Sequence, residues 1–335
     1  MRHISIKDIA RIAKVSHSTV SRALRNSALL PVETRERIQR IAKEQGYAAS
    51  AVARSLATRK THAIGVVVTS IADPFNGEVV SGIEETANEA GYSVILATSQ
   101  TDPRREMALV HSFKERRVDG ILVASSRVGA LYAASLVDLR IPLVLLNNQH
   151  VGRFVHSVSI DNVSGAEKAT KHLAGLGHTK IAYIGDRFGM QSDTERLRGY
   201  RKGLRACGIP LRGEFILQGD GKPDGAREAA SHLLSLPDPP GAIFCYNDMS
   251  ALGVLEEAAQ RDLEVPRDLS ICGFDDLFFT PFLNPPLTTI RQPKREMGRR
   301  AMALLLQLLA GEQHGKTVAV EGELIVRGST AHPRI

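Results

Sequence analysis

The 335-residue sequence lacks the features of a membrane or secreted protein. No uninterrupted apolar run approaches the ~18 residues that a membrane span needs. Met1-Arg2-His3 leads directly into a polar amphipathic segment, so we expect no signal peptide. The sequence therefore predicts a cytoplasmic protein with no membrane partner.

The sequence has only three cysteines, at Cys207, Cys245 and Cys272. They are far apart, have no C-x-x-C spacing and lie in or beside apolar stretches. We interpret all three as buried thiols.

Motifs of catalysis are also missing. There is no P-loop, no G-x-S-x-G elbow and no H-E-x-x-H, and the eleven histidines show no metal-ligand spacing. We expect no enzyme activity, no cofactor and no metal site.

Charge is distributed unevenly along the chain. Residues 1–60 contain 13 Lys and Arg against 4 Asp and Glu, a net charge of +9, whereas the remainder carries −2. A basic segment attached to a nearly neutral body is typical of a protein that binds a polyanion. A solvated basic tail is the alternative, but this segment also carries helix caps and apolar periodicity.

Three short helices are predicted in the basic segment. Ser5 and Asp8 resemble a capping box before a helix over residues 6–13, and Lys14-Val15 makes the turn. Ser16 begins a second helix with Val20 and Leu24 facing inward, and a third runs from Pro31 to Gly46. This arrangement predicts a helix-turn-helix unit whose second helix enters the major groove.

Several motifs make the assignment specific. I-K-D-I-A at residues 6–10, V-S-H-S-T-V-S-R at 15–22, E-T-R-E-R-I at 33–38 and A-V-A-R-S-L at 51–56 resemble the LacI/GalR family of bacterial regulators. The resemblance implies a transcription regulator, expected to be a repressor, that binds a double-stranded, pseudo-palindromic operator as a homodimer or higher oligomer.

The resemblance places His17, Ser18 and Arg22 at the positions that read bases. An arginine can bond both O6 and N7 of guanine, although a phosphate contact is the alternative for Arg22. Candidates for phosphate contacts are Ser5, Thr19, Ser21, Asn26 and Thr34, of which Ser5 and Thr19 have capping as an alternative role.

A hinge helix is predicted over residues 51–58, with Ser50 as its cap. This is shorter than the ~12–15 residues that an isolated helix needs. By resemblance, the hinge contacts DNA through Val52, Ala53 and Leu56. Val52 packs against its copy in a second subunit and Leu56 is a wedge in the minor groove. The alternative role of Leu56 is an anchor on the adjacent domain.

After residue 61, apolar runs alternate with helical patterns. Runs at 64–68, 94–97, 120–123 and 143–146 are separated by helices near 77–90, 104–116 and 130–139, and a second series has runs at 181–185, 215–217, 242–245 and 269–273. Such alternation predicts two doubly wound parallel sheets.

This part resembles the periplasmic-binding-protein-like fold that the family uses to bind effectors, through D-G-I-L-V at 119–123, R-L-R-G-Y at 196–200 and G-F-D-D at 273–276. The predicted fold class is an all-α helix-turn-helix head plus hinge helix, joined to an α/β module of two doubly wound parallel-sheet subdomains. The predicted domains are 1–49 for the head, 50–61 for the hinge and 62–335 for the effector-binding and dimerisation module. Its N-subdomain covers about 62–161 and 291–320, and its C-subdomain about 162–290 and 321–335.

Ligands of doubly wound sheets bind beyond the carboxyl ends of the strands. This criterion, extended by family positions, selects an effector set of polar side chains and one aromatic. The set consists of Asp73, Phe75, Asn76, Ser125, Arg127, Asn147, Asp161, Arg196, Asn247, Asp275 and Gln292.

Such side chains suit a small, carbohydrate-like effector bound between the subdomains. Alternatives remain: Asp275 and Asn247 as strand-end caps, Arg196 in a surface salt bridge and Asp73 opening a turn. Several family members place an aromatic where this chain has Gly221, so the pocket is expected to prefer a ligand other than an ordinary hexopyranoside.

Three other functions compete with an effector-controlled regulator. An enzyme on the same fold lacks its motifs, and a transport-type binding protein lacks a signal peptide and has no need of a basic head. A DNA-binding architectural protein without effector response is opposed by the polar strand-end set.

Overall fold

The computed structural model describes residues 4–24, 26–47, 60–126, 141–147, 156–312 and 317–334. The chain forms two compact units, Met1–His62 and Ala63–Ile335, which we describe separately as the head and the body. The predicted hinge helix and the helix predicted near 130–139 lie outside the described residues. Among those that are described, no helix is both long and apolar enough to cross a bilayer.

The head consists of α1 (Ile6–Ala13), α2 (His17–Leu24) and α3 (Val32–Glu44). The predicted capping box is present: Ser5 Oγ accepts from Asp8 N at 3.3 Å, and Asp8 Oδ2 accepts from Ser5 N at 3.0 Å. Lys14 ends α1 in the left-handed region, with φ 51°. The three helices bury a small apolar core of Ile9, Ala10, Ala13, Val20, Ala23, Ile38 and Ala42.

The body contains two six-stranded sheets. The first has the order β11-β5-β4-β3-β1-β2, and each of its pairings is parallel. Its strands are β1 (Ala63–Val68), β2 (Ser93–Thr98), β3 (Gly120–Ala124), β4 (Leu143–Leu146), β5 (His156–Ile160) and β11 (Thr317–Val320).

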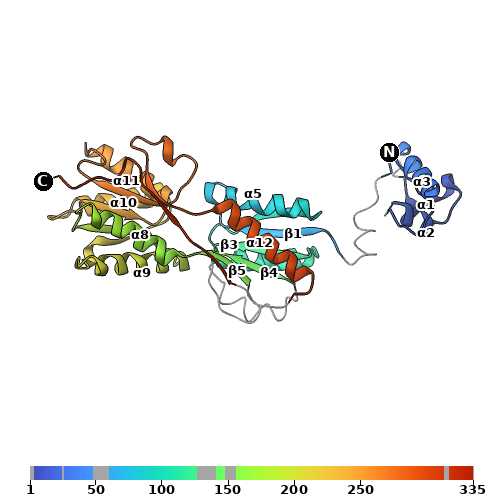
Figure 1. Ribbon diagram of the computed structural model, residues 1–335, viewed down its shortest axis with the longest axis horizontal. Coiled ribbons are helices and arrows are strands. Elements are labelled where there is room, and N and C mark those ends of the chain that lie inside the picture. The colour runs from blue at the N-terminus through green and yellow to red at the C-terminus, as the bar shows by residue number, and fades with distance from the viewer. Residues whose placement is uncertain are drawn as a thin grey trace. The chain divides into compact units, whose positions relative to one another are not determined.

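Helices cover both faces of the first sheet, because alternate residues of each strand point to opposite sides. Ile64, Val66 and Val68 share a core with α5 (Pro74–Glu89) and α12 (Lys294–Leu309), whereas Val67 packs with α6 (Pro103–Glu115). Figure 1 shows α5 and α12 side by side on one face. Glycine permits this close approach, since a Cβ added to Gly298 would lie 2.1 Å from Val79 O.

The second sheet has the order β12-β10-β9-β8-β6-β7. Its strands are β6 (Ile181–Asp186), β7 (Ile216–Gly219), β8 (Ala242–Cys245), β9 (Ser270–Asp275), β10 (Thr288–Arg291) and β12 (Glu323–Ile325). One core lies under α10 (Pro223–Leu234) and α11 (Asp248–Gln260), and another lies under α8 (Asn162–Gly175) and α9 (Gln191–Ala206). Two short 3-10 turns, Gly213–Phe215 and Thr280–Phe282, complete this half.

The predicted doubly wound fold is confirmed, with one departure. β12 pairs with β10 in the antiparallel direction, so the second sheet is not wholly parallel. This strand follows β11 after only two residues, 321 and 322, and therefore enters the second sheet at the end where β10 finishes. From that end it runs back along β10, which makes the pair antiparallel.

Candidate DNA-binding surface and candidate effector site

The outward face of α2 presents the predicted base-reading side chains. His17, Ser18 and Arg22 are exposed, whereas Val20 and Ala23 on the opposite face are fully buried in the head core. Leu24, predicted to face inward, is half-buried. The helix therefore has its apolar face fixed by packing and its polar face available to a groove.

Several of the predicted phosphate-contact residues take part in local hydrogen bonds. Ser16 Oγ accepts from Thr19 N at 3.1 Å and lies 2.7 Å from Ser18 Oγ and 2.8 Å from Thr19 Oγ1. Ser5 caps α1. Hydroxyls both donate and accept, so these bonds leave them capacity for DNA.

The remaining phosphate candidates lie at or near helix ends. Asn26 is exposed, adopts φ 53° and accepts a hydrogen bond on Oδ1 from Gln39 Nε2 at 2.7 Å. Ser21 and Thr34 are half-buried on α2 and α3. Val52, Ala53, Leu56 and Arg127 lie outside the described residues.

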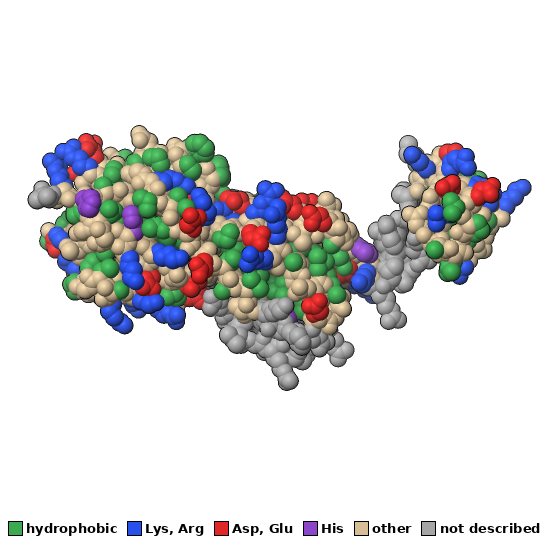
Figure 2. Space-filling model, in the orientation of Figure 1, with side chains coloured by type: hydrophobic (Ala, Val, Ile, Leu, Met, Phe, Trp, Pro, Cys, Tyr) green, Lys and Arg blue, Asp and Glu red, His purple; other side chains and the backbone are tan. Residues whose placement is uncertain are grey.

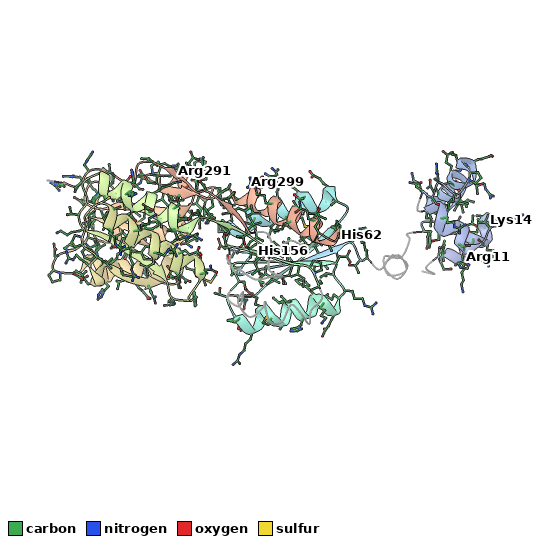
Figure 3. All side chains as sticks on the ribbon, turned by 60° about the horizontal axis from the view of Figure 1, so that its bottom comes forward. Arg11, Lys14, His62, His156, Arg291 and Arg299 are labelled. Carbon is green, nitrogen blue, oxygen red and sulfur yellow. The ribbon has the colours of Figure 1, made fainter. Side chains whose placement is uncertain are left out.

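Basic side chains project from the head on several elements. Figure 3 labels Arg11 on α1 and Lys14 at its end, both directed outward, and Figure 2 shows blue side chains over this unit. The exposed members are Lys7, Arg11, Lys14, Arg22, Arg37, Arg40 and Lys43. Their field attracts the phosphate backbone of DNA regardless of sequence.

In the body, the carboxyl ends of the two sheets face each other across short connections. β5 ends at Ile160 and α8 of the other half begins at Asn162, while β10 ends at Arg291 and α12 begins at Lys294. Connections of one or two residues bring the strand ends of both sheets together. Of the predicted effector residues, Asp161 and Gln292 lie in these connections.

Arg196 and Asp275 form the buried centre of this region. They are 3% and 5% exposed, so the alternative of a surface salt bridge for Arg196 is wrong. Arg196 Nη2 lies 3.7 Å from Asp275 Oδ1, and its guanidinium carbon lies 3.7 Å from the centre of the Phe274 ring. Arg196 also donates from Nε to Asn162 Oδ1 at 2.9 Å and from Nη1 to Tyr246 O at 2.6 Å.

Two carboxyl groups, one from each half, influence each other here. Burial raises the pKa of Asp275 to about 7; Arg196 and Lys294 oppose that rise, and the charge of Asp73 adds to it. Burial also raises the pKa of Asp73, although its hydrogen bond from Phe75 N acts the other way. Asp73 is the N-cap of α5, which matches its alternative role as a turn-opening residue.

Three amide side chains of the predicted effector set lie in segments that follow strands. Asn76 lies in the first turn of α5, Asn147 follows β4 with φ 52°, and Gln292 follows β10. Gln292 Nε2 donates to Asp275 Oδ1 at 2.6 Å. Ser125 follows β3, is half-buried and adopts φ 54°.

Phe75, the one aromatic side chain in the predicted effector set, lies in the hydrophobic core. It is 7% exposed and belongs to the core that joins β1 with α5 and α12. Leu277 of the second half belongs to the same core. Phe75 therefore helps to hold the two halves together.

Asp161 and Asn247 act as helix caps. Asp161 Oδ1 accepts from Ser164 N at 2.9 Å, and Asn247 Oδ1 accepts from Ser250 N at 2.8 Å. Asn247 Nδ2 also donates to Gly221 O at 3.0 Å. The capping alternative for Asn247 is therefore present in the structure.

Comparison with known proteins identifies the chain. Residues 5–50 match the family described as bacterial regulatory proteins of the lacI family, and residues 170–330 match a periplasmic binding protein-like domain. The transcriptional repressor CytR of Escherichia coli K12 is 39% identical over 329 residues, covering 97% of this chain and 96% of CytR. The chain belongs to the LacI family.

Solved structures of LacI-family proteins agree with this assignment. The lac repressor dimer bound to operator and an anti-inducer has a TM-score of 0.91 at 26% identity, covering 98% of this chain and all of that one. A complex of the regulator CelR with cellobiose has a TM-score of 0.75 at 29% identity, covering 97% and 99%. The chain is a DNA-binding transcription repressor.

The LacI-family site contains residues that sequence reasoning did not select. Asn162, the first residue of α8, accepts a hydrogen bond from Arg196 Nε. Lys294 is 4% exposed and donates from Nζ to the carbonyl oxygens of Asp275 and Asp276, both at 2.8 Å. These two residues have φ of 120° and 52°, so Lys294 holds a strained turn in place. Nothing in the sequence around Lys294, which follows Gln292 and Pro293, indicates that it bonds to this turn.

Asp248 is the neighbour of Asn247 and lies outside the predicted effector set. It is fully buried, accepts from Leu277 N at 2.8 Å and from Thr289 Oγ1 at 2.6 Å, and burial raises its pKa well above the usual value. It follows a strand end, as Asn247 does, but it faces the packing between α11 and β9. We interpret it as structural.

One sequence prediction about the thiols is wrong. Cys245 and Cys272 are buried, but Cys207 is exposed. The apolar neighbours of Cys207 belong to α9, which ends at Ala206, so Cys207 leaves the helix as its cap. Within the described ranges, no group of three or more His, Cys, Asp or Glu side chains is placed to hold a metal ion.

Proposed function

We propose that this repressor acts in the cytoplasm as a homodimer on a pseudo-palindromic operator, under the control of a small polar molecule. The effector binds where the carboxyl ends of the two sheets meet. The observation that carries this proposal is the buried Arg196–Asp275 pair, which lies at the short connections between the sheets and has polar side chains from both halves around it. Buried charged groups are costly for stability. Their presence at such a junction therefore indicates a functional site.

The head reads the operator through α2. Arg22 forms the paired hydrogen bonds to a guanine in the major groove, with His17 and Ser18 setting the rest of the sequence. Ser5, Thr19, Ser21, Asn26 and Thr34 hold the head on the phosphates. A single head buries too little surface for tight specific binding, which requires two half-sites.

Exposed apolar side chains on the body support the dimer. β2 is an edge strand of the first sheet, and its Ile95 and Leu96 are 37% and 41% exposed. Phe278 and Phe282, after β9, are 68% and 84% exposed. Apolar groups gathered at a sheet edge and on a loop are typical of a protein interface.

The hinge connects effector to operator. We propose that Val52, Ala53 and Leu56 order on DNA as a short helix, with Leu56 inserted in the minor groove. The effector acts by favouring one arrangement of the two halves of the body. If that arrangement holds the hinges of the two subunits apart, the effector weakens operator binding. If it brings the hinges together, the effector strengthens operator binding.

The proposed effector residues are the strand-end set together with Arg127. Asp, Asn and Gln side chains give the paired contacts that polyols need, so we propose a carbohydrate-like polar metabolite. The CelR–cellobiose complex shows a disaccharide on a similar chain. Gly221 adopts φ 71° beside Tyr246 and Asn247, so there is no aromatic platform at this position for a pyranose ring.

Selection from random duplex DNA tests the operator proposal. The full chain is incubated with a random library, and bound DNA is recovered and sequenced over several rounds. We expect one enriched pseudo-palindrome with half-sites about one helical turn apart. An Arg22→Ala chain in parallel should relax the preference at a guanine, and an Arg37→Ala chain, with a basic side chain removed from α3, should keep it. Enrichment of single half-sites, or of no sequence, would refute the proposal.

A further inference from the structure

Three buried oxygens in the effector region have no hydrogen-bond partner within the part of the chain that the structure describes. They are Asn76 Oδ1, Asn147 Oδ1 and Gln292 Oε1. Asn76 and Gln292 are each only 2% exposed. Because a buried acceptor without a partner is costly, its presence in residues that follow strands of both sheets needs an explanation.

The neighbouring bonds fix which end of two of these amides faces the site. Asn76 Nδ2 donates to Thr69 Oγ1 at 3.0 Å and to Ser70 O at 2.8 Å. Gln292 Nε2 donates to a carboxylate oxygen of Asp275. A carbonyl and an ionised carboxylate only accept, so exchanging the amide ends would set oxygen against oxygen while Asp275 is ionised. The unpartnered atoms of Asn76 and Gln292 are therefore acceptors.

The carboxyl groups add further acceptors. Asp275 accepts from Gln292 on Oδ1 and lies in the same region as Asp73, whose charge raises its pKa. The unpartnered oxygens and the carboxyl groups can all accept hydrogen bonds from a ligand. These acceptors come from both halves of the body.

The two buried cations are already engaged by the protein. Arg196 faces Asp275, and its Nε and Nη1 donate to Asn162 and Tyr246. Lys294 donates to two backbone carbonyls and lies 3.4 Å from Glu78 Oε1. An anionic ligand would have to displace these contacts and approach two carboxyl groups.

An open depression beside β10 offers no other anion site. It has a volume of about 410 Å³ and is lined by Glu78, Asp276, Arg291, Gln292, Pro293, Lys294, Arg295, Glu296 and Arg299. Its arginines are paired with acids: Arg291 with Asp276, and Arg299 with Glu85. Of the predicted effector set, only Gln292 lines it.

We propose that the effector carries no anionic group and presents several O–H or N–H donors, which bond to Asn76 and Asn147 from the first half and to Gln292 from the second. Phosphorylated and carboxylated metabolites are excluded. This inference rests on the proposed effector control. It narrows the effector class by charge and by hydrogen-bond polarity, and it makes the ligand a bridge between the halves.

The test uses two metabolite fractions as probes, so it does not require the effector to be known. A protein-free extract of bacterial cells is depleted of polymers by ultrafiltration and divided by anion exchange at neutral pH. The unretained fraction holds neutral and cationic metabolites, and the retained fraction holds anionic ones. Both are brought to the same ionic strength, because operator binding depends strongly on salt. The readout is the operator affinity of the full chain by fluorescence anisotropy.

We expect the unretained fraction to change operator affinity by about tenfold and the retained fraction to leave it unchanged. Activity in the retained fraction alone would overturn this inference and leave the proposed effector control intact. Operator binding that responds to neither fraction would overturn both, and absence of operator binding would refute the proposed function itself.

A pair of matched variants tests whether Gln292 Oε1 accepts a hydrogen bond from the effector. Gln292→Met removes the unpartnered oxygen and keeps the side chain's length, and it should reduce the response to the unretained fraction by about tenfold or more. Gln307→Met makes the same change at an exposed position of α12 and should respond like the parent. An unchanged response in Gln292→Met would overturn the proposal.

Discussion

The buried carboxyl group of Asp275 makes a quantitative prediction about stability and pH. Its pKa is about 7 in the folded chain against 3.8 for an ordinary aspartate. At ~1.4 kcal/mol per pH unit, this difference corresponds to about 4 kcal/mol. Because the folded pKa is raised, the contribution of Asp275 is fully present below pH 3.8 and is lost as pH rises through about 7.

The perturbation is Asp275→Asn, which removes the titration and keeps an oxygen to accept from Gln292 Nε2. Asparagine has nearly the same shape as aspartate, so the backbone at this position, with φ 120°, meets the same side-chain volume. The stability of the variant relative to the parent should rise with pH, by about 3 kcal/mol between pH 4.5 and pH 8. The measurement is urea unfolding of both chains across this range at one fixed protein concentration, since dimerisation links stability to concentration.

Glu167→Gln is a control of opposite sign. Hydrogen bonds from Lys171 and Lys202 lower the pKa of Glu167, so its contribution is present above the ordinary glutamate pKa and is lost as pH falls through the folded value. This variant should lose stability relative to the parent as pH rises to the ordinary glutamate value of 4.5, so its series extends to lower pH than that of Asp275→Asn. If the difference between Asp275→Asn and the parent does not depend on pH, or falls as pH rises, the burial argument for the effector site is wrong.

Three further predictions concern the head, the dimer and the core. Arg22→Ala should weaken operator binding by about 1–3 kcal/mol and leave nonspecific binding nearly unchanged; an equal loss on all sequences in filter binding would make Arg22 a phosphate contact instead. Leu96→Glu should convert the dimer to monomers in sedimentation, because it places a charge on the exposed edge strand; a dimer that persists at micromolar concentration would remove β2 from the interface. Gly298→Ala should cost about 1–3 kcal/mol because its Cβ would meet Val79 O, whereas Gly175→Ala, with open space around it, should be neutral or stabilising by about 0.5–1 kcal/mol; equal effects in thermal unfolding would contradict the close helix contact.

Local signals predicted the head well. Ser5 with Asp8, Ser16 and Pro31 are capping signals that act within one helical turn, so α1 to α3 begin where the sequence indicates. The apolar runs of β1, β3, β4, β6, β8 and β9 were also found, because central parallel strands are buried on both faces. The runs of the edge strands β2 and β7 were found as well.

The sequence reading missed the strands whose burial depends on distant partners. β5 contains Ser157 and Ser159, both fully buried, and β10 begins with two buried threonines. Ser157 Oγ bonds to Thr317 Oγ1, a residue 160 positions away, and Thr288 N donates to Ser329 Oγ. Polar residues satisfied across such separations give no apolar run, so β5, β10, β11 and β12 escaped detection.

The effector set shows a similar division. The strand-end rule found Asp275 and Asn76, because the position of a residue after a predicted strand is local information. Gln292 was selected from the family resemblance, since β10 was not predicted. It did not find Asn162 or Lys294, whose roles depend on how the two halves meet. Burial also distinguishes the two roles considered for Arg196, a site residue or a surface ion pair. That burial could not be known before the fold.

The most direct test of effector-controlled repression is one titration of operator by three chains, with and without the active metabolite fraction. The parent should bind operator and change its affinity when the fraction is added. Arg196→Ala should bind operator like the parent without the fraction and show no response, because Arg196 lies in the body. Leu56→Ala, which changes the proposed hinge wedge, should bind operator weakly. An Arg196→Ala chain that still responds, together with a Leu56→Ala chain that binds operator like the parent, would contradict both the effector site and the hinge.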